Sequence, residues 1–100
     1  MLLQAQIFID KDKLKDMRPL HIFIMRELLK MGILGATSFT GHSGFGQNQV
    51  LKQPARQFSF DETPMVITFI DEEEKVKEAI TEIRKHYSGG IIVTHSVNQW

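Results

Sequence analysis

Four histidines are the side chains of this 100-residue chain that are best suited to proton transfer or metal binding. They are His21, His42, His86 and His95, and none of them lies in an HxH or HExxH arrangement or has a cysteine partner. His42 is followed by Ser43, but adjacent residues on an extended chain point apart, and no orienting carboxylate can be identified. The sequence therefore predicts no catalytic residue and no metal site, and we expect that the protein is not an enzyme.

A glycine-rich segment is the second place where the residue types suggest chemistry. Gly41-His42-Ser43-Gly44-Phe45-Gly46 contains three glycines in six residues. Glycines carry no Cβ, so successive backbone amides can approach a phosphate closely. The segment is not a dinucleotide-binding fingerprint, because no helix is expected to follow it, and it lacks the Gly-Lys-Ser/Thr ending of a P-loop. On these residues alone, a ligand cradle and ordinary turn glycines both remain open.

The position of this segment depends on the strands and helices around it. Apolar and polar residues alternate over 2–9, which predicts a strand with one strongly apolar face. A helix is expected from Pro19, which suits a first helical turn, to Gly32, which ends it. A short strand is then expected over 36–40, directly before the glycine-rich segment.

The second half of the chain repeats the pattern of strand, helix and strand. Pro64 is expected to open a strand over 65–70, and Asp71 and Glu74 have the spacing of a capping box at a helix start. Apolar residues recur with helical spacing as far as Tyr87, and Gly89-Gly90 follows as the end of this helix. The last strand is expected over 91–97.

This order predicts an α+β, ferredoxin-like βαββαβ fold in a single domain, residues 1–100. Right-handed crossovers place both helices on one face of a four-stranded antiparallel sheet. Because the strands offer Leu, Ile, Val or Phe on both faces, we expect the other face to be apolar and to pack against further copies of the chain. The long stretch 42–60 is expected to form a mobile loop.

Charge and cysteine content limit the classes of partner. Lys plus Arg is 12 and Asp plus Glu is 12, so there is no net positive charge to attract nucleic acid. The chain has no cysteine, which excludes disulfides and suits a reducing cytoplasm, where we expect the protein to act. The longest apolar runs, such as Ile22 to Met25, are too short for membrane insertion.

The motifs between residues 19 and 46 resemble those of an uncharacterised family of small PII-like proteins of bacteria and archaea. The chain reads Pro19-Leu20, a helix, Gly32-Ile33-Leu34-Gly35-Ala36-Thr37 and then Gly41-x-x-Gly44-Phe45-Gly46, in the order and spacing of that family. Pro64, the apolar strand after it and Asp71-x-x-Glu74 also fit, so the resemblance covers nearly the whole chain. The same Gly-Phe-Gly opens the mobile T-loop of the PII signal proteins, to which the family is similar in fold.

The resemblance implies a PII-like signalling protein. It implies a homotrimer that binds a small ligand, expected to be an adenine nucleotide, in clefts between subunits. The segment 42–60 would then correspond to the T-loop and contact a partner protein. By position, the ligand-binding residues are expected to be Gly44, Phe45, Gly46, Gln47, Ser88, Gly89 and Gly90.

Cations are absent from the end of the chain, where PII proteins hold phosphates. Residues 91–100 include no Lys or Arg, and charge-assisted hydrogen bonds are the strong contacts to phosphate. Lys52 and Arg56 of the long loop are therefore the candidate phosphate contacts. The alternative is a structural, interaction or metal-responsive trimer that binds no nucleotide.

Overall fold

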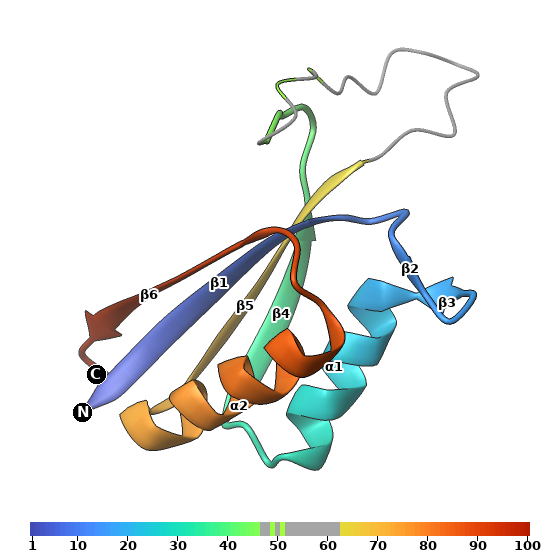
Figure 1. Cartoon of the computed structure of the whole chain (residues 1–100). Helices are drawn as coiled ribbons and strands as arrows, with labels where there is room; N and C mark the ends of the chain where they lie inside the picture. Colours follow the sequence, from blue (N-terminus) through green and yellow to red (C-terminus); the bar gives the residue numbers. More distant parts are fainter. Residues whose placement is uncertain (47–48, 50, 52–62) are drawn as a thin grey trace.

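The computed structural model describes residues 1–46, 49, 51 and 63–100. Its main sheet has four strands in the order β4-β5-β1-β6, and each neighbouring pair is antiparallel. Both helices lie on one face of this sheet (Figure 1). This arrangement is the ferredoxin-like βαββαβ fold, as the sequence predicted. The elements are β1 (Leu2–Asp10), β2 (Leu14–Lys15), β3 (Arg18–Pro19), α1 (Leu20–Lys30), β4 (Gly35–Thr40), β5 (Pro64–Glu72), α2 (Glu73–His86) and β6 (Ile91–Val97).

The core lies between the sheet and the two helices. Alternate residues of β1 and β5 face the helices and are buried, whereas the residues between them are mostly half-exposed. This alternation confirms the period of two predicted for 2–9, and the helices add their apolar residues at helical spacing. The buried apolar residues are Leu3, Ala5, Ile7, Ile9, Met65, Ile67 and Phe69 from the strands, and Leu20, Ile24, Leu28, Val76, Ala79 and Ile83 from the helices.

The other face of the sheet is covered by no helix of the described part of the chain. The strand register aligns four apolar residues, one from each strand, in a row across the sheet. We call Phe39, Val66, Phe8 and Ile91 the apolar row. Phe8 is 40% exposed, Phe39 58% and Ile91 45%, so this row meets solvent in the single chain.

Polar residues interrupt the uncovered face beside the apolar row. Thr37, Thr68 and Gln6 align in the next row, and Gln4 lies one row further along β1. Gln4 Nε2 donates a hydrogen bond of 2.7 Å to Thr68 Oγ1. The expectation of a uniformly apolar face is therefore wrong, because the second face of β1 contains two glutamines between its apolar ends.

Two local features differ from the sequence-based expectation around α1. Residues 10–18 contain the small β2–β3 hairpin, whose turn residues Asp16 and Met17 have φ of 51° and 67°. Pro19 caps α1 at its N-terminal end instead of lying inside its first turn. Gly32 adopts a φ of 71° just after α1 and ends the helix as predicted. No helix of the described residues is long and apolar enough to cross a membrane.

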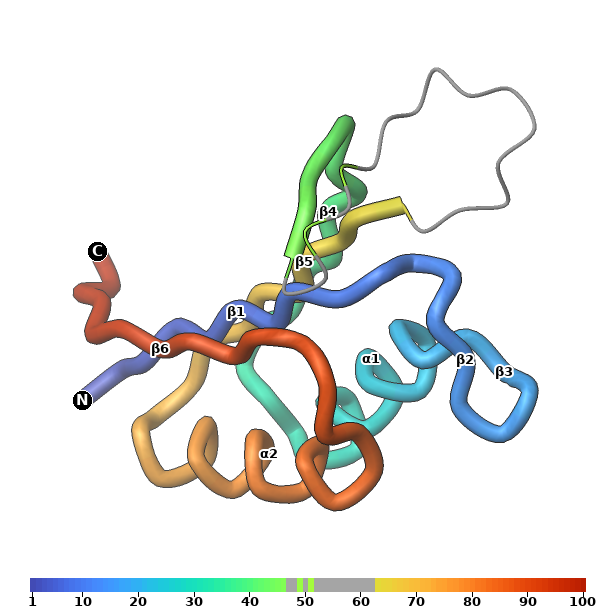
Figure 2. The backbone as a smooth tube through the Cα atoms, turned by 45° about the horizontal axis from the view of Figure 1, so that its top comes forward, coloured from blue at the N-terminus to red at the C-terminus, as the bar shows by residue number. Residues whose placement is uncertain are grey.

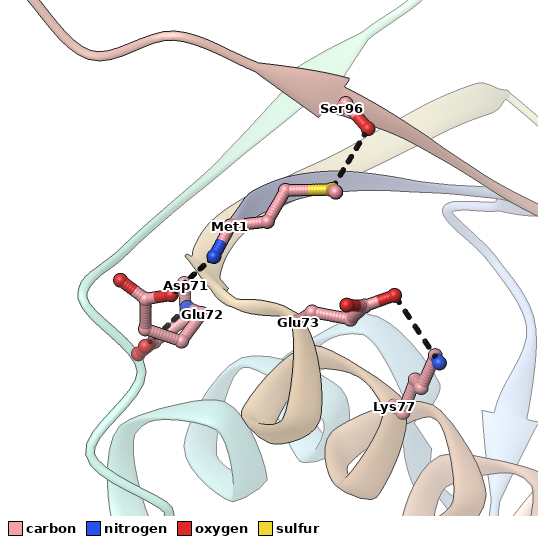
Figure 3. A network of polar contacts seen from close by, with 6 residues as sticks. All are labelled: Met1, Asp71, Glu72, Glu73, Lys77 and Ser96. Carbon is pink, nitrogen blue, oxygen red and sulfur yellow. Dashed lines mark hydrogen bonds and ion pairs between the residues drawn. The ribbon is translucent and has the colours of Figure 1, made fainter.

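The predicted capping box at α2 is wrong, because β5 continues two residues further than expected. Asp71 therefore lies in the strand, on the buried face, and α2 begins after Glu72. Asp71 Oδ2 accepts a hydrogen bond from the Leu34 amide at 2.8 Å, and Oδ1 accepts one from the Glu72 amide at 2.6 Å. Figure 3 shows Asp71 and Glu72 beside the amino group of Met1, which donates to Glu72 Oε2 at 3.1 Å. The Asp71 carboxylate thus joins the end of β5 to the segment that leads into β4.

Replacing Asp71 with alanine is expected to lower the free energy of unfolding by about 2 kcal/mol, because two amides lose their acceptor in a partly buried place. Urea denaturation measures this change. Glu72→Ala is the matched control, since its carboxylate pairs with an exposed amine and surface pairs contribute less than about 1 kcal/mol. Equal stability of the Asp71→Ala variant and the wild type would contradict the proposed role of the carboxylate.

Candidate functional site

The glycine-rich segment begins directly after β4 and packs against the start of β5. The Gly41 amide donates to the Pro64 carbonyl at 2.7 Å. A Cβ on Gly41 would lie 3.1 Å from Pro64 Cγ and 3.3 Å from the Pro64 carbonyl oxygen. A side chain at position 41 would not fit between the two backbones, so Gly41 is explained as an ordinary turn glycine.

Gly44, Phe45 and Gly46 have more room around them. A Cβ on Gly44 would only touch Pro64 at 3.5 Å, and a Cβ on Gly46 would meet no atom of the described residues within 4 Å. The Phe45 side chain is 65% exposed. Packing within the chain therefore does not explain the glycine at position 46, and these residues are available to a ligand or to another copy of the chain.

The second predicted binding segment, Ser88 to Gly90, is a tight turn between α2 and β6. Gly90 has a φ of 71°, and a Cβ there would lie 2.6 Å from the Phe8 carbonyl oxygen. A Cβ on Gly89 would lie 2.9 Å from the Tyr87 hydroxyl oxygen. α2 itself ends at His86, and Tyr87 has extended backbone, so the predicted helical position of Tyr87 is wrong. Contacts within the chain therefore require the glycine at position 90, whereas at position 89 only the outer end of the Tyr87 side chain would have to move.

A cation that the sequence analysis missed holds this turn. Arg84 Nη1 donates to the Gly89 carbonyl at 2.6 Å and lies 3.4 Å from the Tyr87 carbonyl, and Nη2 donates to the Gly90 carbonyl at 3.3 Å. A planar guanidinium has the fork of donors that such a cluster of acceptors needs. In the sequence, Arg84, Lys85 and His86 form a basic run at the end of the predicted helix, which suits the negative end of the helix dipole and does not single out Arg84. The signal that could have revealed this role is an arginine in the last helical turn directly before a Gly-Gly turn.

The two candidate segments lie at the same end of the sheet but at opposite edges. Thr40 pairs with Met65, Asp10 with Pro64 and Phe8 with Ile91, so β4 ends where β6 begins. β4 and β6 are nevertheless the outer strands, with β5 and β1 between them (Figure 2). Three strand spacings separate them by roughly 14 Å. One chain alone therefore brings the two segments to one end of the sheet and does not bring them together.

Three of the expected contacts cannot be placed. Gln47, Lys52 and Arg56 lie outside the described residues, as does most of the segment 42–60.

The four histidines come from different parts of the fold, with His21 in α1 and His86 in α2. His42 follows β4 and His95 lies in β6, at the other edge of the sheet. The His86 ring contacts the Phe23 ring edge-on at 5.0 Å, and its Nε2 lies 3.6 Å from Glu82 Oε1. Among the described residues, no group of three His, Asp or Glu side chains is arranged to hold a metal ion.

The fold is that of the PII-like group of ferredoxin-like proteins. Solved structures with this fold include CPII of Thiomonas intermedia K12, a nitrogen regulatory PII-like protein bound to ADP, AMP and bicarbonate. It is 20% identical, with a TM-score of 0.65 over 94% of this chain and 83% of that one. The divalent ion tolerance protein CutA1 of Ehrlichia chaffeensis is 14% identical, with a TM-score of 0.67 over 99% of this chain and 83% of that one. At these identities the likeness concerns the fold.

The chain belongs to the DUF190 family, described as "Uncharacterized ACR, COG1993", whose model matches residues 2–99. A relative in sequence is the UPF0166 protein of Aquifex aeolicus (strain VF5). It is 27% identical over 84 residues, which cover 84% of this chain and 80% of the relative. The family resemblance inferred from the glycine motifs is confirmed.

Proposed function

We propose that this protein is a PII-like regulatory protein that acts as a homotrimer in the cytoplasm and binds an adenine nucleotide between neighbouring copies. One observation carries the proposal: the two candidate binding segments, 44–46 and 88–90, lie at the same end of the sheet but at opposite edges. If the β4 edge of one copy meets the β6 edge of the next, both segments face one shared cleft. The site is then complete only in the assembly.

The uncovered face of the sheet supports the assembly part of this proposal. Phe8, Phe39 and Ile91 of the apolar row are all at least 40% exposed in the single chain. Exposed apolar patches of this kind are usually covered by a partner in soluble proteins. The hydrogen-bonded polar residues beside the row would fix the register between copies, because each needs a defined partner once it is buried.

The nucleotide part rests on the family pattern and on the solved neighbours. CPII of Thiomonas intermedia K12, which shares the fold, was solved with ADP, AMP and bicarbonate bound to it. In our proposal the bound nucleotide changes the affinity of the segment 42–60 for a partner protein, and no reaction is catalysed. A ligand can shift such an equilibrium only by its difference in affinity between the two states.

A panel of AMP, ADP, ATP, cyclic nucleotides and cyclic dinucleotides in a thermal-shift assay tests the proposal. At a nucleotide concentration of 100 times the dissociation constant, binding to the native state adds about 2.7 kcal/mol of stability, which raises the melting temperature of a chain of this size by about 10 °C or more. We expect at least one adenine nucleotide to raise the melting temperature. A flat response to the whole panel would contradict nucleotide binding.

A second candidate function is a metal-responsive or interaction trimer without a nucleotide. The absence of Lys and Arg from residues 91–100 favours it, and the neighbour CutA1 is named for divalent ion tolerance. Stabilisation by a divalent cation that is lost in His42→Ala or His95→Ala would support this candidate over the first.

A further inference from the structure

The turn Tyr87 to Gly90 has unused hydrogen-bond donors. The Ser88 amide has no acceptor among the described residues, and the Ser88 side chain is exposed. Three of its four carbonyls, those of Tyr87, Gly89 and Gly90, point in contrast toward the guanidinium of Arg84. Most of the acceptors of the turn therefore face Arg84.

The geometry of the trans peptide decides where the donors point. A carbonyl and the amide of the next residue point in opposite directions across one peptide plane. Because the Tyr87 and Gly89 carbonyls point toward Arg84, the amides of Ser88 and Gly90 are directed away from it. Two backbone amides that point away from Arg84, next to an exposed serine, suit an anionic oxygen.

The charge of Arg84 favours the same kind of ligand. Arg84 makes no ion pair with a carboxylate among the described residues, so its positive charge is offset only by carbonyl dipoles. The side chain is half-buried behind the turn, where solvent screens its charge less than at a free surface. The neighbouring cation differs, because Lys85 lies 3.2 Å from Glu82, and that hydrogen bond lowers the pKa of the Glu82 carboxyl.

We propose that Arg84 is the positioning residue for the anionic end of the ligand, which is a phosphate group of the adenine nucleotide. Arg84 draws three of the four carbonyls of the turn inward and thereby presents the amides of Ser88 and Gly90 to the phosphate. Its positive charge takes the place of the cations that residues 91–100 lack. It acts from behind the turn and does not contact the ligand. This inference rests on the proposed nucleotide binding and adds the residue that makes it possible.

The first test measures the turn without any ligand, in the full chain. Hydrogen exchange of the Tyr87 amide, which donates to the Ile83 carbonyl at 2.9 Å where α2 leads into the turn, is expected to be at least tenfold faster in Arg84→Gln than in the wild type. Lys85→Gln removes the same charge one residue away and is expected to leave the exchange within twofold. Arg84→Lys keeps the charge but has no fork of donors. Its exchange is therefore expected to be as fast as that of Arg84→Gln. Wild-type exchange in Arg84→Gln or in Arg84→Lys would overturn the proposal.

The second test compares AMP with adenosine by calorimetry. Arg84→Gln is expected to bind AMP at least tenfold more weakly than the wild type, with adenosine affinity changed by less than threefold, whereas Lys85→Gln keeps both. Wild-type AMP affinity in Arg84→Gln, or an equal loss for adenosine, would overturn the role of Arg84. Failure of the wild type itself to bind AMP, ADP or ATP would instead contradict the proposed function. The two failures are therefore distinguishable.

Discussion

Replacing Phe8 with aspartate is expected to convert the assembled protein into monomers. Phe8 lies in the central strand β1, between Val66 and Ile91 of the apolar row, on the face that no described helix covers. A carboxylate buried between copies of the chain has no partner there, and an unpaired buried charge costs several kcal/mol. Light scattering after size-exclusion chromatography, at micromolar protein concentration, measures the mass.

The same substitution should leave the single chain folded, because the Phe8 side chain is 40% exposed there and contributes little to the core. Leu29→Asp is the matched control. Leu29 is 79% exposed on α1, in the helical layer, and its replacement is expected to leave the mass unchanged. A trimeric Phe8→Asp variant, or a wild type that is monomeric under these conditions, would contradict assembly through the uncovered face.

Replacing Gly90 with alanine is expected to lower the free energy of unfolding by about 2–4 kcal/mol and to abolish nucleotide binding. The new Cβ would lie 2.6 Å from the Phe8 carbonyl oxygen. This oxygen belongs to the backbone of a central strand and cannot move without disturbing the sheet. The φ of 71° adds about 1–2 kcal/mol for any residue with a Cβ. Urea denaturation gives the stability, and calorimetry with AMP gives the binding.

Gly35→Ala separates this effect from the general cost of replacing a glycine. Gly35 lies in the edge strand β4, and a Cβ there would meet no atom within 4 Å. Its stability is expected to stay within about 0.5 kcal/mol of the wild type. Equal stability of the Gly90→Ala and Gly35→Ala variants would show that the turn tolerates rearrangement, and would remove the reason for a fixed binding segment before β6.

Much of the fold could be predicted from the sequence because its periodicities are strong. The alternation over 2–9 and the helical spacing in α2 are long enough to identify each element and its buried face. The β2–β3 hairpin was missed because two-residue strands carry no detectable period and the turn Asp16-Met17 lacks the usual Asn-Gly or Asp-Gly. The capping box was wrong because Asp71 satisfies the spacing rule from inside a strand, where tertiary contacts outweigh the local pattern.

The candidate site was less predictable, because its parts come together only through the topology. The glycines at 41, 44, 46, 89 and 90 were visible, but not which of them the chain itself requires. Backbone contacts explain the glycines at 41 and 90, whereas no contact among the described residues explains the glycine at 46. Arg84 was assigned to the helix dipole, since its hydrogen bonds to the next turn depend on a backbone path that no sequence period encodes.

A crystal structure grown with ADP tests the central claim most directly. The account predicts one nucleotide for each chain, located between the segment 44–46 of one copy and the turn 88–90 of its neighbour, with a phosphate oxygen within hydrogen-bond distance of the Ser88 amide. A nucleotide held by one copy alone, or an assembly in which these two segments do not face each other across an interface, would contradict it.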